Sequence, residues 1–263
     1  MIPLKRFGQN FLTDKNILSL IISRAGLNSQ DCVLEIGPGH GVLTRAILEK
    51  EISCLHAIEL DQRLKPELEE LERSKKNFHL HWGDAVNFDY ESLKPFPDKA
   101  VANIPYNITT PLIWNLLKFS PQGLKYFLFM LQKEAALRLI APPDTKERYP
   151  LGITVEAMGR AVIVKNVSRK CFRPVPEVDS AVVEIVAEKN FGLLKNSAWS
   201  ELLHRGFAHR RKTLLNNLKG FKNIEISEWK KIFSSLKLDE NIRAEDLTCE
   251  EWLKIHEEAG KNS

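Results

Sequence analysis

The sequence predicts an α/β fold with a mainly parallel sheet, followed by a small all-helical C-terminal domain. Short apolar strands alternate with amphipathic helices in the first two thirds of the chain, a pattern typical of a parallel sheet covered on both faces. A glycine-rich loop follows the first of these strands. From Trp199 to Glu258 the spacing is helical, with no convincing strand. We therefore expect one domain over residues 1–187 and a second over residues 188–263.

The expected elements follow from apolar runs and from helical spacing. In chain order, we expect strands over Cys32–Ile36, Cys54–Glu59, Phe78–His81, Lys99–Asn103, Tyr126–Leu131, Ala161–Val167 and Ser180–Ala187. We expect the last two strands to be hairpin-like. In the same order, we expect helices over Asn16–Ala25, Leu43–Lys50, Leu64–Glu72, Pro111–Leu117 and Gln132–Ile140.

Composition excludes several classes of protein. A hydrophobic fraction of 43% and a charged fraction of 27% are ordinary for a soluble globular chain, so we do not expect general disorder. Four cysteines in 263 residues, with no C-x-x-C pair, indicate neither a disulfide scaffold nor a structural metal site. Free thiols favour a reducing compartment such as the cytoplasm. Residues 1–10 have no apolar core and no apolar run is long enough to span a bilayer, so we expect neither a secretory signal nor a membrane partner.

The glycine-rich loop is Glu35-Ile-Gly-Pro-Gly-His-Gly41. Glycine lets the backbone turn sharply and approach a ligand closely, and ligands of open α/β sheets lie beyond the carboxyl ends of the strands. The spacing of Gly37, Gly39 and Gly41 differs from the dinucleotide fingerprint, because Val42 stands where the last glycine is expected. A tight turn without a ligand is the alternative for this loop alone.

Two acidic residues end the next two strands. Glu59 can accept hydrogen bonds from both ribose hydroxyls, and Asp84, followed by Ala85, can accept one from an adenine amino group. Taken singly, each is better explained as a solvated residue or a helix cap. Together with the glycine loop they predict a pocket for an adenosine without phosphates. S-adenosylmethionine is the commonest cofactor of that kind.

The segment Asn103-Ile-Pro-Tyr-Asn107 follows the fourth strand at the same edge of the sheet. The Asn103 side-chain oxygen and a carbonyl beside Pro105 can accept the hydrogens of an amino group. Those contacts would expose the nitrogen lone pair to an electrophilic methyl group. Tyr106 can stack on a flat base, a contact worth about 1–3 kcal/mol. A strand-ending proline turn is the alternative for Asn and Pro alone.

The charge is unevenly distributed. The net charge is +4, and Arg205–Lys222 holds six basic residues and no acidic one. We expect Arg205, Arg210, Arg211 and Lys212 to lie near one helix surface, where they would bind the phosphates of a nucleic acid, which the resemblance described below implies is RNA. A solvated helix that packs on the main domain is the alternative reading of this run.

The sequence resembles the ribosomal RNA adenine dimethyltransferases that modify small-subunit (16S) RNA. The resemblance runs from about Lys5 to Leu218 and rests on motifs that occur in the family's order. They are Q-N-F-L from Gln9, E-I-G-P-G-H-G, E-L-D from Glu59, G-D-A, N-I-P-Y-N, F-R-P-V-P-E-V-D-S from Phe172 and F-A-H-R-R-K-T-L from Phe207. It implies a Rossmann-like S-adenosylmethionine-dependent methyltransferase sheet. It also implies dimethylation of N6 of two adjacent adenosines near the 3′ end of that RNA, and a role in small-subunit biogenesis.

The resemblance also implies roles for single residues. Asn10 and Leu12 would close over the cofactor, Gly37 and Gly39 would hold its methionine end, and Glu59 would hold its ribose. Asp84 and Ala85 would contact the adenine ring. The target amino group would be positioned by Asn103, Pro105 and Tyr106, with Phe172 stacked on the other face of a flipped base. Asn103 would also contact the cofactor. A core aromatic beside a proline turn is the alternative for Phe172. The partner would be small-subunit ribosomal RNA in a pre-30S particle, and we expect a monomer.

Two other functions remain open. Enzymes that methylate a large-subunit (23S) adenine and confer macrolide resistance share Q-N-F, the glycine loop and N-I-P-Y-N; the segment from Phe172 to Ser180 and the R-R-K run favour the small-subunit branch. A non-catalytic assembly factor on the same fold is the other alternative, and intact Glu59, Asp84, Asn103 and Tyr106 argue against it. An asparagine, a proline and a tyrosine that position an amino group would also suit a DNA adenine methyltransferase. No segment of the sequence indicates recognition of DNA bases, however.

Overall fold

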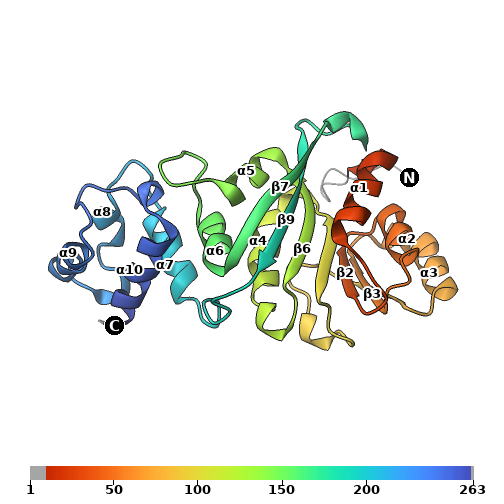
Figure 1. The fold of residues 1–263 in the computed structure, drawn as a ribbon, viewed down its shortest axis with the longest axis horizontal. Helices are drawn as coiled ribbons and strands as arrows, with labels where there is room; N and C mark the ends of the chain where they lie inside the picture. The colour runs from red at the N-terminus through yellow and green to blue at the C-terminus, as the bar shows by residue number, and fades with distance from the viewer. Residues whose placement is uncertain (1–9, 262–263) are drawn as a thin grey trace. The chain divides into compact units, whose positions relative to one another are not determined.

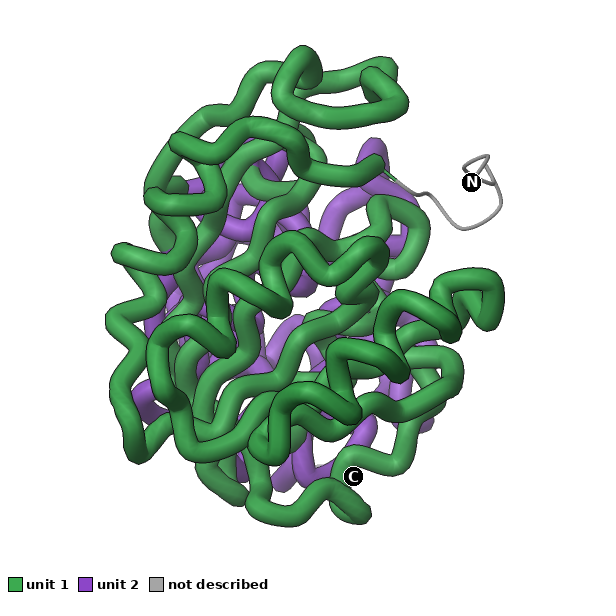
Figure 2. The backbone as a smooth tube through the Cα atoms, turned by 90° about the vertical axis from the view of Figure 1, so that its right-hand side faces the viewer, with its two compact units in different colours: residues 1–136, 162–187 green, residues 137–161, 188–263 purple. Residues whose placement is uncertain are grey.

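The structure, a computed structural model, describes residues 10–261, so Lys5 and Gln9 of the family motifs lie outside the described residues. The chain forms two compact units, coloured separately in Figure 2. The first contains the chain up to Ala136 together with Val162–Ala187, and the second contains Leu137–Ala161 together with the chain from Glu188 onward. One boundary between the units falls after residue 187, as expected. The extent of the first domain needs a correction, because 137–161 belongs with the C-terminal helices.

A seven-stranded sheet forms the centre of the first unit, in the order β4-β3-β2-β5-β6-β9-β7 (Figure 1). Every expected strand is present, with bounds that differ by at most two residues. The strands are β2 (Cys32–Ile36), β3 (Cys54–Glu59), β4 (Phe78–Trp82), β5 (Lys99–Asn103), β6 (Tyr126–Gln132), β7 (Gly159–Val167) and β9 (Ser180–Ala187). The pairs from β4 to β6 are parallel and β9 is antiparallel to β6. The parallel strands all end at one edge, which brings their terminal residues together.

Helices pack beside this sheet, as Figure 1 shows for α2 and α3 next to β2 and β3. The helices along the first unit are α1 (Lys15–Ala25), α2 (Val42–Leu48), α3 (Lys65–Ser74), α4 (Thr109–Leu117) and α5 (Lys133–Ile140). Helix α1 begins where the Asp14 carboxylate accepts hydrogen bonds from the Asn16 and Ile17 amides, and it ends at Gly26 in a left-handed conformation. These caps satisfy backbone groups that the helix itself leaves without partners.

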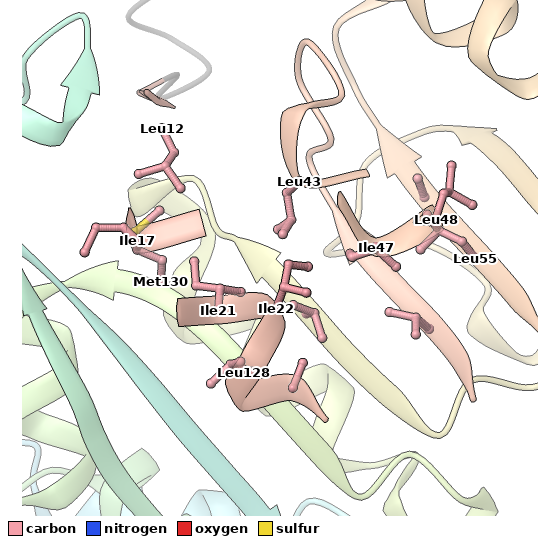
Figure 3. Packing of buried hydrophobic residues seen from close by; sticks show 14 of the residues in the cluster. Leu12, Ile17, Ile21, Ile22, Leu43, Ile47, Leu48, Leu55, Leu128 and Met130 are labelled. Carbon is pink, nitrogen blue, oxygen red and sulfur yellow. The ribbon is translucent and has the colours of Figure 1, made fainter. Parts of the chain in front are cut away.

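One apolar cluster joins α1 and α2 to the sheet (Figure 3). Ile21 of α1 and Ile47 of α2 pack with Leu55 of β3 and Leu128 of β6, and each is at most 2% exposed. Full burial of one such side chain contributes about 1.5–3 kcal/mol relative to exposure. The cluster therefore fixes the positions of the parallel strands, whose last residues meet at one edge of the sheet.

A short two-stranded ladder was not expected from the sequence. Strand β1 (Phe11–Leu12) pairs antiparallel with β8 (Phe172–Arg173), with Leu12 opposite Phe172. Each strand has only two residues, which is too short for alternation of apolar and polar residues to be recognised. The ladder brings the first described residues of the chain onto the segment that precedes β9.

The second unit is helical apart from the first residues of β7. Its helices, after the last residues of α5, are α6 (Pro150–Met158), α7 (Ala198–Gly206), α8 (Leu214–Leu218), α9 (Ile226–Ser235) and α10 (Cys249–Lys261). Three tryptophans form its core: Trp199, Trp229 and Trp252 are each 0% exposed. The Trp199 indole N–H donates to the Thr154 hydroxyl at 2.9 Å, which ties α6 to α7. No described helix has the length and apolar character needed to cross a membrane.

Helix α6 was missing from the expected elements because it is buried nearly all round. All of its residues except Glu156 are buried, so its sequence has no apolar stripe. Gly152 is required by packing, because a Cβ there would lie 2.3 Å from the Arg138 carbonyl oxygen.

Candidate active site

A cavity of about 800 Å³, including its open mouth, lies at the carboxyl edge of the parallel strands. Its walls come from the glycine loop after β2 and from the ends of β3, β4 and β5, as expected for an open α/β sheet. The site residues named from the sequence that line it are Asn10, Gly37, Gly39, Glu59, Asp84, Ala85, Asn103, Pro105 and Tyr106. The sequence motifs therefore meet in one cavity, although they are spread over almost a hundred residues.

Glu59 is the most constrained polar group of the cavity. It is 7% exposed, and its carboxylate accepts the Gly39 amide at 3.1 Å, the Leu60 amide at 2.9 Å and the Asp61 amide at 2.8 Å. Burial raises the pKa of Glu59 above its ordinary value, and these three backbone donors act in the opposite direction by favouring the ionised form. The carboxylate is thus held in one orientation at the end of β3. Its remaining lone pairs suit a pair of vicinal hydroxyls.

The glycine loop contacts Glu59 and Phe11 through Gly39. Gly37 and Gly39 have φ of 66° and 57°, the left-handed region that favours glycine. A Cβ on Gly39 would lie 2.8 Å from the edge of the Phe11 ring, which itself lines the cavity. The loop therefore needs glycine at position 39 for two independent reasons, backbone conformation and close approach.

Asp84 and Ala85 form the wall that follows β4. The Asp84 carboxylate accepts the Val86 amide at 2.9 Å and the Asn87 side-chain amide at 2.7 Å, so it is oriented by its own turn. The buried Tyr90 hydroxyl donates to the Ala85 carbonyl at 2.6 Å and fixes the next peptide. This wall offers one carboxylate and an apolar surface, which fits the edge and face of an adenine ring.

Asn103 connects β5 to the first described residue of the chain. Its side-chain N–H donates to the Asn10 carbonyl oxygen at 2.9 Å. This bond commits the NH₂ end of the amide to the backbone and leaves the amide oxygen as the group that can face a ligand. Of the two neighbouring carbonyls, that of Pro105 already accepts the Ile108 amide at 3.2 Å, which favours Ile104 as a second acceptor.

Tyr106 is held by a residue to which sequence reasoning gave no role. Its hydroxyl shares a hydrogen bond of 2.7 Å with the hydroxyl of Ser180, which is 0% exposed at the start of β9. Burial raises the pKa of Tyr106 above its ordinary value, so the phenol stays protonated at neutral pH. Ser180 ends the motif that begins at Phe172, and the antiparallel pairing of β9 with β6 brings it to the edge of the sheet where Tyr106 lies.

Two expected site residues lie in the core instead. Leu12 is 8% exposed and Phe172 is 0% exposed; they face each other across the β1–β8 ladder and belong to the apolar cluster. Neither lines the main cavity, whereas Phe11, next to Leu12 and on the opposite side of β1, does. The expectation that Phe172 stacks on a base is therefore wrong for this structure, because its ring has no exposed face.

Glu35 is a buried carboxyl beside the glycine loop. It is 1% exposed, and burial raises its pKa to about 8, with the nearby Glu59 carboxylate a smaller cause. The group is therefore largely neutral at pH 7. It lines a smaller cavity, shared with Pro38 and Asn103, next to the main one.

The basic residues of the second unit are not arranged as expected. Helix α7 ends at Gly206, where a side chain would lie 2.5 Å from the Trp252 ring. Arg210, Arg211 and Lys212 therefore lie in the loop between α7 and α8, and only Arg205 is on the helix. The prediction of one helix surface was wrong. The Asn217 side chain holds the loop by donating to the carbonyls of Gly206 and His209, at 2.6 and 3.2 Å.

The close approach at position 39 gives a direct test of the cavity. We expect Gly39→Ala to weaken S-adenosylmethionine binding at least tenfold, since the new methyl group and the Phe11 ring occupy the same space. Gly26→Ala is the matched control, because Gly26 has φ of 54° and no atom within 4 Å of the added Cβ. Both variants should lose about 1–2 kcal/mol of unfolding free energy in urea from the left-handed backbone. Titration calorimetry that finds equal binding by both variants would contradict the assignment.

Comparisons with known proteins agree with this geometry. The family model described as ribosomal RNA adenine dimethylase matches residues 4–261. A relative from Rubrobacter xylanophilus, named ribosomal RNA small subunit methyltransferase A, is 37% identical over 258 residues, covering 97% of this chain and 94% of its own length. A protein of the same name from Lactococcus lactis is 39% identical over 260 residues, covering 95% and 88%.

Solved structures give the same result. A dimethyladenosine transferase from Plasmodium falciparum matches with a TM-score of 0.82 at 29% identity, covering 95% of this chain and 98% of that one. The 23S rRNA methyltransferase ErmE matches with a TM-score of 0.66 at 23% identity, which shows a common fold. With a family model that spans nearly the whole chain and a cavity built from the family's motifs, this protein belongs to the ribosomal RNA adenine dimethylases, which are S-adenosylmethionine-dependent methyltransferases.

Proposed function

We propose that this protein dimethylates N6 of two adjacent adenosines near the 3′ end of small-subunit (16S) ribosomal RNA. It acts in the cytoplasm, as a monomer, on a precursor of the small subunit (a pre-30S particle), and contributes to the biogenesis of that subunit. The observation that carries the proposal is that Asn103 and Tyr106 line the same cavity as Gly37, Gly39 and Glu59. An amino-group site and an adenosine site thus share one space.

The residues of the cavity fit S-adenosylmethionine by the chemistry of their donors and acceptors. Glu59 accepts hydrogen bonds from the ribose hydroxyls, and Asp84 and Ala85 contact the adenine ring. Gly37 and Gly39 leave room for the methionine end. Asn10 closes the cavity beside Asn103. When bound, the cofactor supplies an electrophilic methyl group, and the protein's task is to place a nucleophile beside it.

Asn103 prepares that nucleophile. Its amide oxygen accepts one hydrogen of the adenine amino group, and a carbonyl of the Ile104–Pro105 turn accepts the other. These two bonds draw the nitrogen towards a tetrahedral shape and turn its lone pair out of conjugation with the ring. No strong base is needed, because the amino nitrogen becomes acidic once it is methylated and its proton then leaves to solvent.

Tyr106 orients the base. Its phenol is fixed by Ser180 at one end, so the ring presents a constant face to an adenine that has left its helical stack. Phe172 is buried in the core and offers no ring face to a base. Tyr106, which lines the cavity, is therefore the ring that we assign to stacking. The second face of the base has no assigned partner.

The small-subunit substrate is favoured over the large-subunit one by two observations. The relatives from Rubrobacter xylanophilus and Lactococcus lactis are named for the small subunit and share more than a third of their residues with this chain. Ser180, the last residue of the segment that distinguishes the small-subunit branch, contacts Tyr106 directly. A non-catalytic assembly factor would have no need to retain this contact.

The activity is tested by primer extension on 16S RNA from a strain that lacks the protein. We expect the two methylation stops to disappear and to return with the wild-type gene, but not with Asn103→Ala. In vitro, Asn103→Ala should lower labelled methyl transfer at least a hundredfold, with S-adenosylmethionine binding changed much less. Stops that persist in the deletion strain, or transfer to 23S RNA alone, would refute the proposed substrate.

The contact between Ser180 and Tyr106 predicts a positioning effect. We expect Ser180→Ala to lower kcat about five- to tenfold with little change in KM, because a buried phenol without its partner costs about 1–3 kcal/mol. In a Tyr106→Phe background the same change should have no further effect. Ser120→Ala is the control, since Ser120 is also fully buried and its hydroxyl has no hydrogen-bond partner among the described residues. Additive losses in the double variant would contradict the positioning role.

The second unit offers an RNA surface around Tyr149. The Tyr149 ring is 37% exposed, with the guanidinium groups of Arg138 and Arg210 at 4.7 and 5.9 Å from its centre. Arg211 and Lys212 are exposed on the same loop as Arg210. Cations grouped around an aromatic ring suit both phosphate and base contacts. Arg205 contributes at the end of α7, where it donates to the Lys219 carbonyl at 2.9 Å.

This surface predicts a change in the salt dependence of RNA binding. We expect an Arg211→Ala, Lys212→Ala variant to bind substrate RNA more weakly, with a plot of log affinity against log salt shallower by about 1.4–1.8. Lys230→Ala with Lys231→Ala is the control, because those lysines are equally charged but pair with Glu240 and Glu228. Filter binding at several salt concentrations that finds equal slopes for both variants would exclude the basic loop as a contact.

A further inference from the structure

A second group of chemically active side chains lies at the opposite end of the strands from the active site. Cys32 and Cys54 are the first residues of β2 and β3 and stand directly opposite each other in the parallel ladder. His56 follows two positions later and therefore points to the same face of the sheet as Cys54. Their neighbours Val33 and Leu55 belong to the apolar cluster under α1 and α2, so the two thiols and the imidazole face the other side.

The ligand atoms of these residues are close together and fully enclosed. The sulfurs of Cys32 and Cys54 and a ring nitrogen of His56 all lie within 4.8 Å of one another, and the three residues are at most 5% exposed. The Cys54 sulfur is 3.4 Å from His56 Nε2. The Pro95 carbonyl oxygen is 3.0 Å from the same nitrogen and 3.4 Å from the Cys32 sulfur.

These separations match the edges of a small tetrahedron. With metal–sulfur bonds of about 2.3 Å and metal–nitrogen bonds of about 2.0 Å, the corners of a tetrahedral site lie roughly 3.3–3.8 Å apart. Three edges of the cluster, at 3.0, 3.4 and 3.4 Å, are within about 0.4 Å of that range or inside it. Because the corners stand on rigid strands and on one turn, little rearrangement is needed to centre an ion among them.

The surroundings supply the support that metal-binding histidines commonly have. His56 Nδ1 is 3.0 Å from His81 Nε2, and His81 stands on the neighbouring strand β4. A histidine that binds a metal through one nitrogen usually donates the other N–H to an acceptor, which fixes the ring. In this arrangement His81 would accept that N–H and leave His56 Nε2 facing the two sulfurs.

We propose that Cys32, Cys54 and His56, with the Pro95 carbonyl, form a binding site for a thiophilic divalent cation of the zinc class. Charge favours a divalent ion over a monovalent one, because two thiolates and one 2+ ion leave no net charge in a buried place. The sequence rule that counts C-x-x-C pairs does not detect this site, since its ligands come from two strands and a turn. The ion would join the amino ends of β2 and β3, whose carboxyl ends carry the glycine loop and Glu59.

The test uses the full-length protein, stripped of metal by a chelator and kept reduced by a phosphine. We expect added Co²⁺ to produce sulfur-to-cobalt charge-transfer absorption in the near ultraviolet and the intense visible bands of a tetrahedral site, saturating at one ion per chain. Added Zn²⁺ should remove both signals and raise Tm. Because this measurement uses the wild-type protein, it does not depend on the folding of any variant. Octahedral bands without sulfur charge transfer, or no saturable binding, would overturn the proposal.

Variants assign the ligands. Cys54→Ala should abolish the charge-transfer band and the Zn²⁺-dependent rise in Tm, while Cys249→Ala, which removes a buried thiol of the second unit, should leave both unchanged. His81→Phe should weaken Zn²⁺ about 10–100-fold without changing the band position, because it removes the support of His56 and no ligand. A band that survives Cys54→Ala, or that is lost in Cys249→Ala, would place the bound ion elsewhere and refute this site.

Discussion

The active site depends on the buried carboxylate of Glu59. It stands at the end of one parallel strand and accepts the Gly39 amide from the loop after the neighbouring strand, at 3.1 Å. This single bond connects the residue that would hold the ribose with the loop that would surround the methionine end. Burial makes a charged carboxylate costly, and three backbone N–H groups offset that cost only in the observed orientation. The geometry of the proposed cofactor cavity is therefore set before any ligand enters, which reduces the ordering that binding requires.

The sheet topology explains why the proposed substrate site lies beside the proposed cofactor site. Strand β5 is next to β2, so the Asn103 segment ends at the same edge as the glycine loop. Strand β9 lies antiparallel beside β6 and begins where β6 ends, which brings Ser180 to that edge as well. A parallel strand in that place would have its first residue at the opposite edge. The reversal of β9 thus makes the contact between Ser180 and Tyr106 possible.

Local patterns in the sequence predicted most of the fold because they reflect backbone periodicity. The strand bounds of β2, β3, β5 and β9 were predicted to the residue, since each is an apolar run that ends in a turn residue or acidic group. Predictions failed where tertiary contacts decide the structure. Helix α6 is buried nearly all round and has no stripe, and α7 ends at Gly206, before the basic residues that were expected to continue on its surface. Likewise, no pattern in a two-residue strand distinguishes Phe11, which faces the cavity, from Leu12, which faces the core.

The position of Phe172 bears on how a base can enter the site. Its ring is enclosed by the apolar cluster, and its backbone pairs with β1, whose Phe11 lines the cavity and packs against Gly39. Exposing the Phe172 ring would remove a large aromatic surface from the core and would disturb the same short ladder that holds Phe11. Truncation of a buried phenylalanine to alanine costs about 3–5 kcal/mol, so we expect the Phe172 ring to stay in the core when a base stacks on Tyr106 in the proposed site. Strand β1 therefore borders both regions, because Phe11 lines the candidate cofactor cavity while Leu12 pairs with Phe172 in the core.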